Sequence, residues 1–179
     1  LSYNRLGDVS LQAWQVTEAL GHYQKFLEIR QKRAAADPTD AQAQLDLYGS
    51  YHRIAAVQQK QKQYEQAIES YGRGLKVLQA LKEQNRLAPA NEKEIGYVEQ
   101  AIQQCKHAPT ATGDWKTLLE QPADLLPVLL EMRGTQFVQE GRAGEAVQAV
   151  AKLRELGTAN ANQLYNAACV YSLCAAAIK

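Results

Sequence analysis

The residues that most often carry metal or acid–base chemistry are few in this chain and widely separated. Its three histidines, His22, His52 and His107, stand on different segments, and no HExxH or Cys/His spacing suits a metal. Glu18 lies four residues before His22 and could share a metal with it on one helix face, although a surface pair is the simpler interpretation. We therefore predict that the chain holds no metal and no cofactor.

Nucleophilic catalysis needs an activated serine or cysteine, and the sequence arranges neither. The three cysteines, Cys105, Cys169 and Cys174, form no CxxC pair, which favours free, buried thiols in a reducing cytoplasm. No GxSxG turn presents a serine, and the glycines form no phosphate-binding loop. Glu92 and Glu94 suit the start of a helix, where the dipole favours negative charge. We expect that the chain is not an enzyme and that it acts through a surface.

Composition favours an all-α fold and limits the classes of partner. The chain has 179 residues, 46% of them hydrophobic, a net charge of +1 and only 5 prolines. Its many Ala, Leu, Gln and Glu residues are good helix formers. A nearly neutral chain presents no strong field to nucleic acid or to an anionic membrane, and no apolar run is long enough to span a bilayer. We expect a cytoplasmic protein that binds neither.

The chain repeats its opening stretch at an offset of 48 residues. The recurring pairs are Tyr3 and Tyr51, Val9 and Val57, Ala19 and Ala67, Tyr23 and Tyr71, and Leu27 and Leu75. Apolar residues in each copy follow the spacing of an amphipathic helix, and the phase breaks near residues 12–15. Each copy is therefore predicted to be a helical hairpin, and repeats of this size stack side by side.

Within each hairpin the residue types come in one order: an aromatic, a leucine or isoleucine, a small residue, an alanine and an aromatic. The two sets are Tyr3, Leu6, Gly7, Ala19 and Tyr23, and Tyr51, Ile54, Ala55, Ala67 and Tyr71. This order resembles the tetratricopeptide repeat (TPR) family, which implies an α-α superhelix of stacked antiparallel hairpins. The small residues should let the helices approach, and the tyrosines should fill the space around them. Pro38 arrives late for the family, so extended second helices are expected, as in TPRs of the kinesin light chain kind.

Four further segments add a narrower resemblance. They are Leu45 to Val57, Cys105 to Pro109, Trp115 to Pro122 and Leu164 to Ser172. Together they look like the long TPR tails of certain bacterial serine/threonine protein kinases. The chain itself has no kinase Gly-rich loop, HRD or DFG. The resemblance implies that a kinase domain precedes residue 1 and that this chain is its regulatory or targeting region.

We predict one continuous array with three parts. Residues 1–107 hold two long hairpins and one further helix that ends near Lys106, residues 108–121 a linker and a short helix, and residues 122–179 a shorter hairpin and a final capping helix. In the last part Leu130, Gly134 and Phe137 recur 34 residues later as Leu164, Ala168 and Tyr171. Arg133 stands where the family has a leucine. The segment 107–113, which contains Pro109 and Gly113, is the clearest linker signal.

In the TPR family the first helix of each hairpin lines a concave face, and the resemblance implies the same here. The candidate partner-binding residues, all off the packing stripes, are Asn4, Arg5, Asp8, Gln12, His52, Arg53 and Lys60. They would form a polar, mildly basic groove for an extended peptide or a partner helix. An ordinary solvated surface is the alternative.

Two other functions stay open. The final helix has an apolar face that needs cover, so the array could form a homo-oligomer or act as a spacer. That face comprises Leu164, Ala168, Tyr171 and Ala175. A nucleic-acid role is more remote, because the basic cluster near the end of the second helix lacks interleaved aromatics. The cluster comprises Lys25, Arg30, Lys32 and Arg33.

Overall fold

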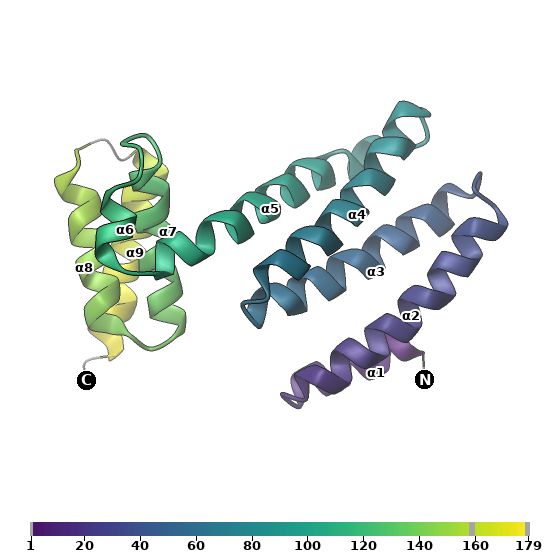
Figure 1. The fold of residues 1–179 in the computed structure, drawn as a ribbon, viewed down its shortest axis with the longest axis horizontal. Coiled ribbons are helices and arrows are strands. Elements are labelled where there is room, and N and C mark those ends of the chain that lie inside the picture. Colours follow the sequence, from purple (N-terminus) through teal and green to yellow (C-terminus); the bar gives the residue numbers. More distant parts are fainter. Residues whose placement is uncertain (1, 158–159, 178–179) are drawn as a thin grey trace. The chain divides into compact units, whose positions relative to one another are not determined.

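The computed structural model describes residues 2–157 and 160–177, and every regular element within these ranges is helical (Figure 1). In chain order the elements are α1 (Tyr3–Gln12), α2 (Val16–Ala36), α3 (Ala41–Lys60), α4 (Tyr64–Glu83), the 3-10 turn η1 (Pro89–Asn91), α5 (Lys93–Thr112), α6 (Trp115–Leu119), α7 (Leu126–Gln139), α8 (Ala143–Glu155) and α9 (Ala161–Ala177). The all-α prediction is confirmed. None of the described helices is long and apolar enough to cross a membrane.

The turns inside the hairpins share one backbone conformation. Trp14, between α1 and α2, and Lys62, between α3 and α4, have φ of 61° and 60°. Gly141, between α7 and α8, has φ of 71°. In the first turn the Gln15 N–H donates to the carbonyl of Ser10 at 2.8 Å, which is the bond of a Schellman motif. The repeat at 48 residues therefore extends to the backbone of the turn, since Trp14 and Lys62 are equivalent positions.

Small residues bring paired helices together, as predicted. Ala19 and Ala67 are fully buried. A Cβ atom added to Gly7 would lie 2.5 Å from Cε1 of Tyr23, so the tyrosine ring occupies the space that the glycine leaves. The prediction for Tyr3 is wrong: its side chain is exposed and stacks on His22 instead of filling the hairpin.

The contacts divide the chain into two compact units, residues 1–106 and 107–179, and the division falls inside α5. In the first unit, α1 to α4 and the start of α5 bury apolar side chains between neighbouring helices. Representative members are Ala55, Tyr71, Leu78, Val98 and Cys105. In the second unit, α6 to α9 surround a separate core. Its largest buried side chains include Leu129, Leu130, Phe137 and Leu153.

The predicted linker at residues 107–113 is instead helical for most of its length. α5 does not end near Lys106 but continues through Pro109 to Thr112. The Thr112 hydroxyl donates to the carbonyl of Ala108 at 2.8 Å, and Ala111 is buried in the core of the second unit. These contacts stabilise the helix beyond a proline that removes one backbone donor. Long-range packing here overrides the local signal.

Candidate interaction surface

The four α1 residues of the predicted groove have unlike environments. Arg5 and Gln12 are exposed, whereas Asn4 is half-buried. The carboxylate of Asp8 accepts a hydrogen bond from the Tyr23 hydroxyl at 2.6 Å. Burial, reinforced by the bond and charge of Asp8, raises the pKa of Tyr23 to about 12. Asp8 therefore ties α1 to α2, and its charge is partly engaged within the hairpin.

The α3 residues of the predicted groove lie on a better defined surface. The His52 ring packs edge-on against Tyr48 and Tyr71, with ring centroids 5.9 Å and 5.5 Å away. Burial lowers the pKa of His52. The carboxylate of Glu94 opposes this effect, and nearby Arg53 adds a lesser effect in the direction of burial. The neutral imidazole is thus favoured at this position, where it serves as a flat, half-buried wall.

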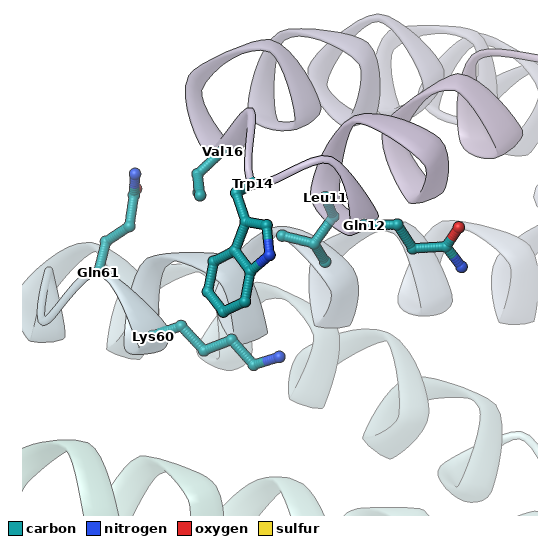
Figure 2. A pocket seen from close by; sticks show the side chains of 6 residues that line it. All are labelled: Leu11, Gln12, Trp14, Val16, Lys60 and Gln61. Atoms are coloured by element: carbon teal, nitrogen blue, oxygen red, sulfur yellow. The ribbon is translucent and has the colours of Figure 1, made fainter. Parts of the chain in front are cut away.

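Two clefts adjoin where α1, α2 and α3 meet. The smaller, of about 130 Å³, is lined by Leu11, Tyr23, His52, Arg53, Ala56, Val57 and Lys60. The larger, of about 460 Å³, is lined by Leu11, Gln12, Trp14, Val16, Lys60 and Gln61 (Figure 2). Leu11 and Lys60 line both. We call the two clefts together the α1–α3 groove.

The structure brings together four of the seven predicted residues. These are Gln12, His52, Arg53 and Lys60, which line the α1–α3 groove. The other three, Asn4, Arg5 and Asp8, line neither cleft. The groove therefore lies toward the C-terminal ends of α1 and α3 rather than along the whole of both helices.

The groove also contains apolar residues that the repeat pattern does not place there. Leu11, Trp14 and Val16 come from the end of α1, its turn and the start of α2. In the sequence, residues 12–15 show only a break in the helical spacing of apolar residues. A tryptophan in such a break was the available signal, because a large apolar side chain in a tight turn has little chance to be buried.

The α1–α3 groove is positively charged. No Asp or Glu lines either cleft. Arg53 and Lys60 form no ion pair with any residue that the structure describes. By contrast, the basic cluster at the end of α2 is partly neutralised, because Arg30 and Arg33 both pair with Asp46. In the first unit, the positive charges of Arg53 and Lys60 are therefore available to a partner.

Other candidate chemistry stays dispersed. Over residues 2–157 and 160–177, no three His, Cys, Asp or Glu side chains are close enough to hold a metal ion. Cys105 and Cys174 are buried free thiols, and burial raises the pKa of Cys105 to about 11. The prediction of burial is wrong for Cys169, which is exposed because it lies on the outer side of α9.

Arg133, the departure from the family pattern, is a buried cation in the second unit. The residue is only 4% exposed, and its guanidinium donates through Nη1 to the carbonyls of Ala111 at 2.9 Å and Gly113 at 2.7 Å. It also stacks on Trp115 and Phe137, with the guanidinium carbon 4.3 Å and 4.8 Å from the ring centroids. Burial lowers the pKa of Arg133. Arg133 therefore has a structural role, because it caps the end of α5.

A scan against protein-family models and searches of curated proteins and of solved structures found no match for this chain.

Proposed function

We propose that this chain is a non-catalytic protein–protein interaction module of the TPR type and that its α1–α3 groove binds a peptide segment or a partner helix. The observation that carries the proposal is the groove itself. Leu11 and Val57 give it an apolar lining, and the ring of His52 forms one wall. Its two cations, Arg53 and Lys60, have no ion-pair partners among the described residues. Protein sites that take a ligand of mixed polarity have this combination of apolar lining and few charged groups.

The repeat gives the groove a rigid frame. Stacked hairpins create extended surfaces between equivalent helices, and such surfaces are suited to long ligands. Here α1 and α3 are equivalent helices at the offset of 48 residues, and Ile54 and Val57 of α3 pack with the first hairpin. A ligand in the groove would therefore meet a surface that is already formed, which limits the entropy lost on binding.

We further propose that the module serves as the regulatory or targeting region of a larger bacterial protein such as a serine/threonine kinase. The support is the resemblance of four segments of the sequence to the TPR tails of such kinases. A cytoplasmic location follows from the same resemblance and from free cysteines. The role would be to bring a catalytic domain to its target.

Charge reversal in the groove tests the proposed function. The probe is a peptide selected from a display library of short random peptides with the wild-type chain as bait, and its affinity is measured by fluorescence anisotropy. Arg53→Glu should change the affinity by at least about tenfold, since it reverses the charge of one of the two cations that line the groove. Arg5→Glu, on the same unit but outside the groove, is the matched control and should leave the affinity unchanged. Failure to select any peptide, or equal affinity for Arg53→Glu, would contradict the proposal.

A second candidate function is self-association through α9, and one observation favours it. The outer side of this helix exposes large apolar side chains, with Tyr165 70% exposed and Leu173 56% exposed. At the offset of 34 residues, Leu130 of α7 is fully buried, whereas its equivalent Leu164 is exposed. Of the predicted apolar face only Tyr171 is partly covered by the core. A second copy of the chain could cover the rest.

A further inference from the structure

Trp14 has a strained backbone conformation and a large apolar side chain that is exposed to solvent. Its φ of 61° lies in the left-handed region, where a bulky L-residue is rare. Gly141 fills the equivalent position of the α7–α8 turn, and a glycine adopts that conformation without a steric penalty. The indole is 87% exposed, so the chain gains little from burying it. Strain of this kind, held at a displayed aromatic, points to a binding role.

The surroundings of Trp14 are those of an anchor site for a ligand. Figure 2 shows the indole beside the larger cleft, below the turn that carries Val16 and above the end of α3 that carries Lys60. Leu11 lies next to the ring, so an apolar group placed there would contact both side chains. Tryptophan is among the residue types enriched at the positions that dominate the free energy of binding.

The cations that line the two clefts favour an acidic occupant. Lys60 lines both clefts and Arg53 lines the smaller, and no carboxylate lines either. The two cations are seven residues apart on α3, which places them on one side of the helix about 10 Å apart along its axis. In an extended peptide of the polyproline II type, residues three apart lie on one side and are separated by about 9 Å. The spacing of cations therefore matches carboxylates at positions i and i+3.

We propose that Trp14 and Lys60 form the anchor site for a peptide segment that carries a large apolar side chain beside a pair of carboxylates three residues apart. The apolar side chain packs on Trp14 and Leu11, and the carboxylates pair with Lys60 and Arg53. This inference rests on the proposed function and adds the chemical class of the ligand and the residue that anchors it.

The first test uses the same display library of short peptides, with no composition imposed. The selected peptides should be enriched in Asp or Glu at positions i and i+3, next to an aromatic residue or leucine. Enrichment of basic peptides, or of apolar peptides without carboxylates, would overturn the assignment of ligand class. The proposed function would still stand if Arg53→Glu changed the affinity of those peptides and Arg5→Glu did not.

The second test locates the contact by fluorine NMR. The chain has 2 tryptophans, so labelling with 5-fluorotryptophan gives two signals that Trp14→Asn assigns. A selected peptide should shift the Trp14 signal, while Trp115, which packs against Arg133 in the second unit, serves as the internal control. A titration that leaves the Trp14 signal in place would overturn the anchor site. A shift of that signal with protein concentration alone would also overturn it, because the occupant would then be a second copy of the chain.

Substitutions separate the anchor from the rest of the groove. Trp14→Asn keeps a residue that tolerates the left-handed conformation and removes the indole, so affinity should fall at least about tenfold while the melting temperature does not fall. Lys62→Asn changes the equivalent residue of the second hairpin turn and should leave affinity unchanged. Lys60→Glu should weaken acidic peptides as strongly as Trp14→Asn. Full affinity in Trp14→Asn, together with lost affinity in Arg53→Glu, would refute the anchor and retain the proposed function.

Discussion

At Gly7 the absence of one methyl group determines how α1 meets α2. An added Cβ would lie 2.5 Å to 2.9 Å from three ring atoms of Tyr23, and the hydroxyl of that ring is held by Asp8. Gly7→Ala should therefore overpack the first hairpin and lower the free energy of unfolding by about 1–3 kcal/mol. Urea denaturation followed by circular dichroism measures the change.

Gly21 provides the matched control on α2. An added Cβ there has no neighbour within 4 Å, and the residue lies inside the helix. Gly21→Ala should raise the free energy of unfolding by up to about 1 kcal/mol, because alanine restricts the unfolded chain more than glycine does. Equal stability of Gly7→Ala and the wild type would show that Tyr23 moves aside freely.

His52 should make the stability of the first unit depend on pH. Burial lowers its pKa in the folded state below the unfolded value, so the unfolded chain binds the proton more readily. The stabilising contribution of the neutral imidazole is present above the unfolded pKa of about 6.5 and is lost as the pH falls toward the folded value. His52→Gln should reduce the loss of stability between pH 7.5 and pH 5.

To isolate the effect of His52, the free energy of unfolding of the variant is compared with that of the wild type at both pH values. An unchanged loss in His52→Gln would mean that other groups account for the acid sensitivity. The carboxylate of Glu94 opposes the effect of burial and so limits its size.

At the scale of the element, α5 depends on Arg133 for the conformation of its last turn. Arg133→Leu, which supplies the residue that the TPR pattern favours, would leave the carbonyls of Ala111 and Gly113 without their cationic donor. We expect the free energy of unfolding to fall by about 2–3 kcal/mol, as for hydrogen bonds to a charged group. Arg142→Leu, which removes an exposed arginine that pairs with Glu145, should cause a smaller loss. A larger loss in Arg142→Leu would contradict this role.

The elements show which features a sequence can predict. The hairpins were predictable because they depend on residues that are close in the sequence. The spacing of apolar residues defines each helix, and Ala19 and Ala67 pack between adjacent helices. The extension of α5 through Pro109 was not, because it depends on Arg133, which is distant in the sequence. For the groove, the α3 residues were predictable from the repeat. Trp14 was not, because its exposure and left-handed backbone depend on the closed turn.

At the scale of the whole molecule, α9 is the element most in need of a partner. Its inner residues, such as Val170, pack in the core of the second unit, whereas Tyr165 and Leu173 project outward. Exposed apolar side chains on a helix offer a surface on which a partner can pack. If copies of the chain cover one another there, the sedimentation coefficient of the wild type should rise with concentration. Tyr165→Glu combined with Leu173→Glu should abolish the rise.

The control for α9 is Tyr97→Glu, which removes an exposed tyrosine of similar accessibility from α5 and should leave the concentration dependence intact. Loss of the dependence in Tyr97→Glu as well would assign self-association to another surface. A wild-type chain that stays monomeric over a wide range of concentration would remove the support for self-association. The proposed role of the α1–α3 groove would be unaffected by that result, because its residues belong to the first unit and α9 belongs to the second.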